Sequence, residues 1–435
     1  MAVAFVGCGY VFDIYMRTQW AYSEIEIAGV YDIDAARLET VSRYYGFATY
    51  DSLEALLADP KVSVVVNLTS INAHYRTIKQ ALLAGKHVYS EKPLTTDVSL
   101  TRELFALAEE RGVVLTGAPC NVYSDSIATI WKAIRDGAIG KPVLIYAELD
   151  DNPAHLMSLE RVRSPTGAPF PYAEEFQEGC TVEHVAYHLV WICAMFGPAV
   201  SVTGFSTMLV EDKTETPLTP ADTPDLSVAC LTFSNGLSAR ITCSWVAPRD
   251  HSFQVIGVEG ALRADNVFHD QSAVRLERFS RVSLSARKSY SLRNLPTLGR
   301  LFGIQGSRIP LLTRWKSHAL VERGVGRSLK HRFVSWLRHR ETYAQDKMLG
   351  IGEMLRALQD NRPQPMQPDF LLHINELTML IHKAGEGGMT AHPQTSFQPF
   401  EPMAEIATET RNYKQSYRPR FIERAMANIV DRMHR

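Results

Sequence analysis

A glutamate and a lysine stand side by side in residues 90–94 (Ser-Glu-Lys-Pro-Leu), directly after the apolar segment 87–89. In an α/β sheet, ligands bind outside the carboxyl ends of the strands, which is where this pair lies if 87–89 is a strand. The ammonium of Lys92 can hold a substrate hydroxyl there and assist proton transfer, while Glu91 can orient Lys92 or contact a cofactor ribose. The alternative is a surface lysine ahead of a proline that starts a helix.

A glycine-rich turn follows the first apolar segment of the chain, residues 2–6. Glycines let the backbone approach a pyrophosphate, and the helix that follows supplies N–H donors and the positive end of its dipole. Phe12 stands where the dinucleotide-binding fingerprint has a third glycine or an alanine, so its ring must change helix–strand packing or the approach of the cofactor. We predict cofactor contacts from this turn: Gly7, Gly9, Tyr10, Val11 and Phe12.

Asp32 ends the second strand-like segment, residues 25–31. A carboxylate at this place accepts hydrogen bonds from ribose hydroxyls and repels a 2′-phosphate, so it favours NAD over NADP. The two glycines alone would fit an ordinary tight turn equally well, and Asp32 could cap a loop. The order of strand, glycines, strand and acid makes the dinucleotide site the better interpretation.

Short apolar segments alternate with helical patterns at the start of the chain, which predicts a doubly wound parallel sheet. After residue 123 the pattern changes to a helix near 124–136, a second near 182–196 and then successive strand-like runs, which favour an antiparallel sheet. We predict three units: an α/β Rossmann domain at 1–122, an α+β domain with a mainly antiparallel sheet at 123–395, and a tail at 396–435.

The glycine-rich turn, Asp32 and the Glu-Lys-Pro run together resemble the Gfo/Idh/MocA family, the glucose–fructose oxidoreductase-like and inositol dehydrogenase-like enzymes that act on sugars and cyclitols. The resemblance implies that Thr69 and His74 belong to a loop that lines the cofactor. It also implies that residues 179–188 take the place of the family's Asp-x-x-x-His motif. Further residues fall where the family's pocket segments fall: Cys120, Asn121, Asn152, Glu178 and Trp245.

Within this motif, Glu183 falls on the aspartate and Tyr187 on the histidine. The two residues are four apart and share a helix face, whereas His188 lies about 100° around the helix. We therefore predict catalytic roles for Lys92, Glu183 and Tyr187, with His188 as the rival base. A tyrosine is a weak base at neutral pH, and we expect a nearby lysine to lower its pKa. The alternative is that Tyr187 only packs and that activity is altered or lost.

Neither a metal site nor a disulfide framework is predicted. His184 and His188 have a spacing that suits two metal ligands, but no glutamate-based zinc motif surrounds them.

The six cysteines are scattered without close pairing, and no apolar run reaches membrane-spanning length. The chain enters a strand directly, which leaves no room for a signal peptide. We therefore expect reduced thiols and a cytoplasmic protein.

A basic block stands out in a chain whose net charge is −1, because residues 271–340 hold 16 lysines and arginines but only two acids. It coincides with a predicted insertion at 280–341. Apolar residues repeat at helical spacing over 329–337, which predicts a basic amphipathic helix. Such a helix can bind an anionic substrate, lie on an anionic membrane or pack on a partner subunit, or it can be a solvated face. Nucleic-acid binding is not expected, since no recognisable motif accompanies the charge.

The hypothesis is an NAD(P)-dependent oxidoreductase that transfers a hydride between nicotinamide and a carbinol carbon. The resemblance implies a sugar, cyclitol or sugar-derivative substrate, which the basic block allows to be anionic, and a homodimer or homotetramer. The alternative is a non-catalytic protein of the same fold that binds NAD and a sugar to control a partner, because a fold does not fix a function.

Overall fold

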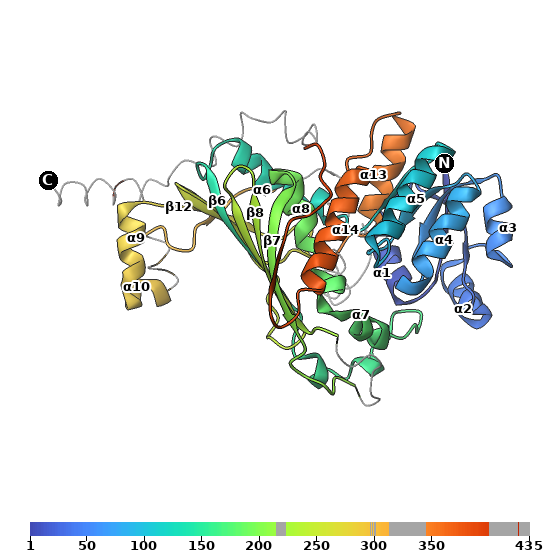
Figure 1. The fold of residues 1–435 in the computed structure, drawn as a ribbon, viewed down its shortest axis with the longest axis horizontal. Helices are drawn as coiled ribbons and strands as arrows, with labels where there is room; N and C mark the ends of the chain where they lie inside the picture. Colours follow the sequence, from blue (N-terminus) through green and yellow to red (C-terminus); the bar gives the residue numbers. More distant parts are fainter. Residues whose placement is uncertain are drawn as a thin grey trace, which may run out of the picture.

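The computed structural model describes residues 1–214, 223–295, 297, 299, 302–312, 345–399 and 425. These residues build two β-sheets. Figure 1 shows the first sheet with its helices at one end of the molecule and the larger second sheet toward the other. Helix α14 (Pro368–His382) lies between them and contacts both α5 of the first unit and β7 of the second sheet.

The first sheet has five parallel strands in the order β2-β1-β3-β4-β5. Its central strands are apolar runs buried on both faces, as expected where helices cover both sides of a parallel sheet. The elements are β1 (Ala2–Val6), α1 (Tyr10–Gln19), β2 (Glu26–Tyr31), α2 (Ala35–Tyr45), α3 (Leu53–Ala58), β3 (Val62–Asn67), α4 (Ile71–Leu83), β4 (His87–Ser90), α5 (Val98–Arg111) and β5 (Leu115–Gly117).

The strand order reverses beside β1, because β2 lies on one side of it and β3 on the other. In doubly wound sheets, ligands bind in the crevice outside the carboxyl ends of the strands at such a point. Gly7 follows β1 with φ +93°, and a Cβ there would come within 2.6 Å of the Leu68 backbone that follows β3. Only glycine allows the two loops to approach this closely.

The second sheet has nine strands in the order β13-β12-β11-β10-β6-β9-β8-β7-β14. All its pairs are antiparallel except β6 with β9, so the predicted mainly antiparallel sheet is confirmed. The strands are β6 (Pro142–Asp150), β7 (Ala199–Thr207), β8 (Leu226–Phe233), β9 (Ser238–Ser244), β10 (Phe253–Gly257), β11 (Gly260–Ala264), β12 (Val274–Arg278), β13 (Ser307–Arg308) and β14 (Met389–Ala391).

Two consecutive helices carry the predicted catalytic motif, α7 (Tyr172–His184) and α8 (Ala186–Phe196). Gly179 interrupts α7 with φ +86°, a left-handed conformation that glycine adopts without strain. Val185, between the helices, has helical dihedral angles, so the helical run continues from Cys180 into α8. α8 is buried over almost its whole length, which fixes the direction in which its side chains point.

The C-terminal part of the chain returns to the first sheet. Helix α13 (Met348–Gln359) contacts α1, and Gly350 at its start packs so closely that an added Cβ would lie 2.8 Å from the Cβ of Cys120. This contact brings Lys347, the residue before α13, to the carboxyl end of β4. Other helices of this half are α6 (Asp125–Arg135), α9 (Arg281–Lys288) and α10 (Tyr290–Asn294).

The predicted fold class is confirmed, and the proposed unit boundaries stay predictions. The amphipathic helix predicted over 329–337 lies outside the described residues, as does most of the tail. All six cysteines are free, as predicted, and Cys230 alone among them is exposed. None of the helices in the described part of the chain is long and apolar enough to cross a membrane.

Candidate active site

A cavity of about 370 Å³ opens at the carboxyl ends of β1, β3 and β4 and is closed on its far side by α7 and α8. Both halves of the chain therefore contribute to its wall. Eight of the predicted site residues line it: Tyr10, Val11, Thr69, His74, Glu91, Lys92, Glu183 and Tyr187. Five others do not reach its wall: Gly7, Gly9, Phe12, Asp32 and His188.

Lys92 forms an ion pair with Glu183, which comes from the other half of the chain. Both side chains are largely buried, with 10% and 11% of their surface exposed. Burial by itself lowers the pKa of Lys92, but the negative charge of Glu183 and the proximity of Tyr187 raise it more, so the pKa lies above its usual value. Lys92 therefore stays protonated at neutral pH, so its ammonium group can donate hydrogen bonds but cannot accept a proton.

Glu91 is held by three donors. The Nζ of Lys347 lies 2.6 Å from its Oε1, the hydroxyl of Tyr15 donates to the same oxygen at 2.9 Å, and the backbone N–H of Lys92 donates to Oε2 at 3.1 Å. Burial opposes ionisation, but Lys347 and the other donors lower the pKa of Glu91 to about 2. Glu91 thus pairs with the ammonium of Lys347 and holds only the backbone of Lys92.

Lys347 is a site residue that sequence reasoning missed. It lines the cavity beside Tyr187, and Glu91 raises its pKa against the effect of burial, so it too is a cation. No motif surrounds it in the sequence, and 256 positions separate it from its partner. Only the return of the chain through α13 brings it into the site.

Tyr187 packs its ring against Phe268, with ring centroids 4.5 Å apart, and lies at the wall of the cavity. The Nζ of Lys92 lies 6.0 Å from its ring centroid. Burial raises the pKa of Tyr187 more than Lys347 and Lys92 lower it, so the net shift is upward. The expectation that a neighbouring lysine leaves this pKa lowered is wrong, because burial outweighs the attraction of both cations.

His188 points away from the cavity and is fully buried. The indole N–H of Trp191 donates to its Nδ1 at 3.1 Å, so Nε2 carries the proton and donates to the carbonyl oxygen of Glu148 at 3.0 Å. Burial lowers its pKa to about 4. Both ring nitrogens are thus engaged in a neutral imidazole, and the geometry favours Tyr187 over His188 as the residue that meets a substrate.

His74 joins the loops that follow β3 and β4. Its Nδ1 lies 2.7 Å from the carbonyl oxygen of Pro93, and its Nε2 lies 3.0 Å from that of Thr69. Burial lowers the pKa of the ring, and a neutral ring can donate to one of these two carbonyl oxygens but not to both. His74 therefore positions Thr69 and the Lys92-Pro93 segment against each other at the wall of the cavity.

The glycine-rich turn fits a dinucleotide. Gly9 caps α1 without any side-chain hydrogen bond, and a Cβ at Gly9 would meet nothing within 4 Å, so the N–H groups that begin α1 face open space. Phe12 explains the departure from the fingerprint, because its ring is fully buried against Phe5, Tyr45 and Phe47. The ring of Phe12 thus fills the space beneath α1 and does not obstruct the glycine-rich turn where the cofactor is expected.

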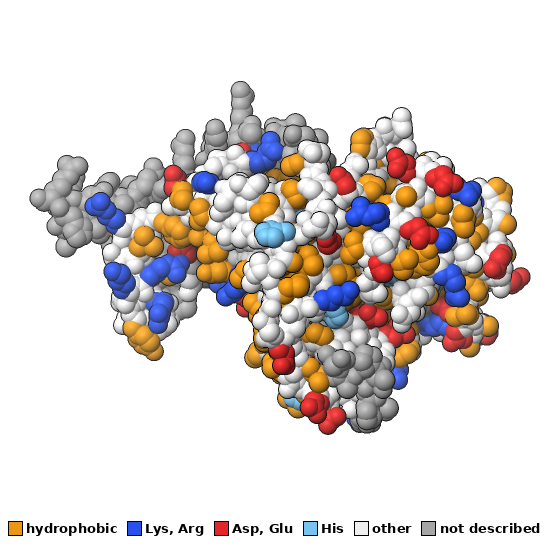
Figure 2. Space-filling view, viewed as in Figure 1, with side chains coloured by type: hydrophobic (Ala, Val, Ile, Leu, Met, Phe, Trp, Pro, Cys, Tyr) orange, Lys and Arg blue, Asp and Glu red, His pale blue; other side chains and the backbone are white. Residues whose placement is uncertain are grey.

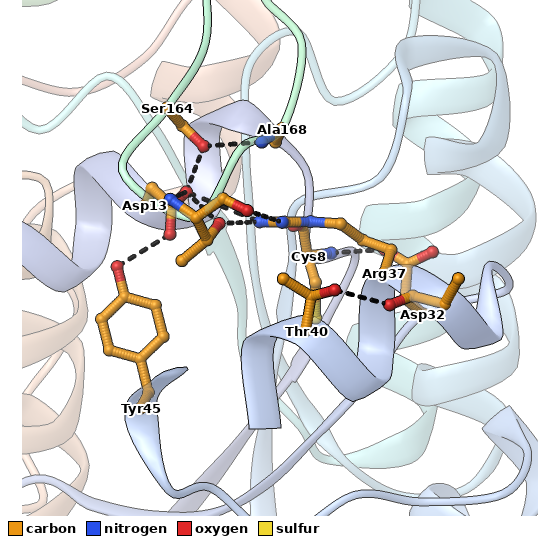
Figure 3. A network of polar contacts seen from close by, with 10 residues as sticks. Cys8, Asp13, Asp32, Arg37, Thr40, Tyr45, Ser164 and Ala168 are labelled. Carbon is orange, nitrogen blue, oxygen red and sulfur yellow. Dashed lines mark hydrogen bonds and ion pairs between the residues drawn. The ribbon is translucent and has the colours of Figure 1, made fainter. Parts of the chain in front are cut away.

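Asp32 is held in place at the end of β2 (Figure 3). The backbone N–H of Cys8 donates to its Oδ2 at 2.6 Å, and that of Asp34 donates to its Oδ1 at 2.9 Å. The nearby Arg37 is directed elsewhere, since its Nε donates to the carbonyl oxygen of Cys8 at 2.5 Å and its other nitrogens reach Asp13 and Thr166. The carboxylate of Asp32 is thus not neutralised by this arginine.

A segment from the second half of the chain is docked on α1 beside the glycine-rich turn. The buried carboxylate of Asp13 accepts hydrogen bonds from the hydroxyls of Ser164, Thr166 and Tyr45 (Figure 3). The ring of Phe170 then packs edge-on against Tyr10, with centroids 5.2 Å apart. Sequence reasoning missed this anchor, and its signal was an acid in the first turn of α1, on a helix that begins with apolar and aromatic residues.

The five residues that the family resemblance assigned to pocket segments do not line one common wall of the cavity. Cys120 and Asn121 line a small adjoining cavity of about 20 Å³, and Asn121 donates to the backbone oxygen of Tyr187 at 2.7 Å. Trp245 packs edge-on against His184. Asn152 and Glu178 do not line the main cavity. Within the described ranges, no three histidine, cysteine or acidic side chains are arranged to hold a metal ion.

The two halves of the chain match two parts of one protein family. Residues 1–118 match the family described as an oxidoreductase family with an NAD-binding Rossmann fold, and residues 127–263 match the GFO/IDH/MocA C-terminal domain. The chain belongs to the Gfo/Idh/MocA family. The family match ends before α9 and the basic block.

Known proteins similar to this Gfo/Idh/MocA member include an uncharacterized oxidoreductase of Synechocystis, 26% identical over 277 residues, which are 60% of this chain and 71% of that protein. The inositol 2-dehydrogenase/D-chiro-inositol 3-dehydrogenase of Lactiplantibacillus plantarum is 29% identical over 147 residues, 33% of this chain and 42% of that protein. The structure of the WlbA dehydrogenase from Bordetella pertussis, in complex with NADH and UDP-GlcNAcA, superposes with a TM-score of 0.63 at 16% identity, over 90% of this chain and 97% of that one.

Family membership confirms the predicted fold class and the predicted oxidoreductase function. The protein is an NAD(P)-dependent dehydrogenase acting on CH–OH groups, and the catalytic hypothesis is supported over the non-catalytic binding protein.

Proposed function

We propose that this dehydrogenase transfers a hydride between a carbinol carbon of a sugar or cyclitol and NAD. The observation that carries the proposal is the Lys92–Glu183 ion pair, which sets a cation and a carboxylate from different halves of the chain beside Tyr187 in one cavity. The names of the inositol dehydrogenase relatives and of the UDP-GlcNAcA-bound neighbour support a polyhydroxylated substrate.

The residues around the glycine-rich turn would hold the cofactor. The open backbone at Gly9 and the start of α1, at Tyr10 and Val11, suit the pyrophosphate, because unpaired N–H groups and the helix dipole favour an anion there. Asp32 suits the ribose of the adenosine half. Thr69, positioned by His74, lines the cavity between this turn and Lys92.

Three side chains would handle the substrate oxygen. NAD, when bound, accepts or returns the hydride at nicotinamide C4. Lys92 donates a hydrogen bond to the reacting oxygen, and Glu183 holds the ammonium in place. Tyr187 exchanges the proton with that oxygen. Because burial keeps its phenol protonated at neutral pH, Tyr187 is ready to donate a proton to a carbonyl, and it accepts one from an alcohol only at alkaline pH.

The cofactor preferred is NAD rather than NADP. Asp32 is fixed at the end of β2 by two backbone N–H groups, and a 2′-phosphate placed there would meet its negative charge. Arg37, the cation next to Asp32 in the network of Figure 3, is engaged with Asp13, Thr166 and the Cys8 carbonyl. It is therefore not available to neutralise a 2′-phosphate.

We also propose a homodimer or homotetramer and a cytoplasmic location. Exposed apolar side chains on outer positions of the second sheet, Val143, Val200 and Phe205, support burial between subunits. Six free thiols are compatible with a reducing compartment.

The direct test measures NADH formation from NAD with a panel of inositols, aldoses and nucleotide sugars. We expect at least one of them to be oxidised, and Lys92→Met to lower kcat by roughly 10²–10³-fold, the usual cost of removing a donor aimed at the reacting oxygen. Lys61→Met, which removes an exposed lysine far from the cavity, is the matched control and should behave as the wild type.

Two results would overturn the proposal. Near-normal turnover by Lys92→Met would remove Lys92 from the mechanism. NADH binding by calorimetry, with none of the panel oxidised and no ketose reduced, would instead support the non-catalytic protein that binds cofactor and sugar.

A further inference from the structure

Two short helices, α9 and α10, protrude from the second sheet at the end of the molecule that lies farthest from the first sheet (Figure 1). They follow β12, which is next to the outermost strand of that sheet. The cavity lies between the two halves of the chain, and no residue of α9 or α10 lines it. A partner bound to α9 and α10 would therefore leave the cavity uncovered.

The tip of the molecule formed by α9 and α10 holds four basic residues and no acidic one, namely Arg281, Arg287, Lys288 and Arg293. There is no acidic residue between Arg278 and Leu312. Arg287 is paired with Glu277, but no carboxylate in the described part of the chain forms an ion pair with the exposed side chains of Arg281, Lys288 and Arg293. Figure 2 shows the lysine and arginine side chains gathered on this projection.

The same tip exposes large apolar side chains. Leu284, Tyr290 and Leu295 have 47%, 75% and 48% of their surface exposed. Leu284 follows Arg281 by three residues and precedes Lys288 by four, so the leucine and the two cations share one face of α9. Exposed apolar groups that are accompanied by polar ones mark sites of interaction with a protein or a membrane when they form a patch.

We propose that the surface formed by α9 and α10 binds peripherally to an anionic lipid membrane. Anionic lipid headgroups would pair with Arg281, Lys288 and Arg293. Leu284 and Leu295 would enter the boundary of the acyl chains, and Tyr290 would lie at the depth of the headgroups. The tip projects outward (Figure 1), so a broad, deformable surface can approach it.

The test is sedimentation of the full chain with vesicles of phosphatidylcholine alone or with one-third phosphatidylglycerol. One variant reverses the charges (Arg281→Glu, Lys288→Glu and Arg293→Glu together) and another removes the apolar groups (Leu284→Ser, Tyr290→Ser and Leu295→Ser together). The matched control reverses three exposed cations of the first unit (Lys61→Glu, Arg102→Glu and Arg111→Glu together), which changes the net charge by the same amount.

We expect the wild type and the control to bind only the anionic vesicles. Charge reversal should weaken this binding by at least about 100-fold, since each of the three cations contributes roughly fivefold and the new carboxylates are repelled. The apolar variant should bind these vesicles at least tenfold more weakly than the wild type. NADH binding by all variants should match the wild type, which shows that they are folded.

The proposal is overturned if the wild type does not bind anionic vesicles, if the tip variants bind them as well as the wild type, or if the control variant loses as much affinity as the tip variants. Tip-dependent binding to soluble polyglutamate without vesicle binding would overturn it in favour of an acidic protein partner.

Discussion

Tyr187 and His188 are neighbours in the chain, yet Tyr187 lines the catalytic cavity while His188 is buried between the Trp191 indole and the Glu148 carbonyl. The residue predicted at the family's histidine position therefore lies at the cavity wall, and the adjacent histidine lies in the core. One step along α8 turns a side chain by about 100°, which is enough to move it from the cavity to the core.

Tyr187→Phe removes only the hydroxyl, so packing against Phe268 should survive. We expect kcat to fall by roughly 10²–10⁴-fold, the usual contribution of a positioned proton donor or acceptor. His188→Gln, which can still donate to the Glu148 carbonyl, should cost far less kcat. Steady-state rates of both variants decide the matter, and the opposite ranking would assign the proton transfer to His188.

Lys347→Met should move the pH dependence of alcohol oxidation. Lys347 and Lys92 are the cations that oppose the upward shift of the pKa of Tyr187, so removal of Lys347 should raise this pKa further. The alkaline rise of kcat should then occur at higher pH, whereas Lys347→Arg should keep the wild-type profile. If both variants kept the profile unchanged, Lys347 would only hold Glu91.

Asp32→Ala should reverse the cofactor preference. The carboxylate is expected to bind ribose hydroxyls through charge-assisted hydrogen bonds, so its loss should weaken NAD binding by roughly 10–100-fold. NADP should bind more tightly than before, because the repulsion is gone. Asp34→Ala, which removes the N-cap of α2, should lower stability but leave the NAD to NADP ratio unchanged. Calorimetric titration of both cofactors measures this, and tighter NADP binding by the wild type would contradict the assignment.

The fold should lose stability on mild acidification. His188 titrates at about 4 when folded and near 6.5 when unfolded, so the unfolded chain takes up a proton that the folded chain refuses. Stability is complete above pH 6.5 and falls as the pH drops toward 4. From pH 7 to pH 5 the loss is about 2 kcal/mol for this group. His188→Gln should flatten the urea-unfolding profile over that range; an unchanged slope would show that other groups dominate.

The local sequence pattern was enough to predict the parallel sheet, the crevice at its edge and the helix face that carries Glu183 and Tyr187. Glycines directly after an apolar strand, an acid after the second strand and a Glu-Lys-Pro run after the fourth predicted the parallel sheet and its crevice, because parallel strands bring their carboxyl ends to one edge. The spacing of Glu183 and Tyr187 placed both on one helix face, since four residues make about one turn. These features depend only on neighbours in the chain.

What the tertiary structure decided depends on residues far apart in sequence. Lys92 meets Glu183, and Glu91 meets Lys347, because the second half of the chain folds back onto the first. The sign of the shift in the pKa of Tyr187 was misjudged from sequence, since spacing shows which charges are near but not how much water is excluded. Desolvation depends on the packing of the whole fold: it raised the pKa of Tyr187 and lowered that of His188 in the core.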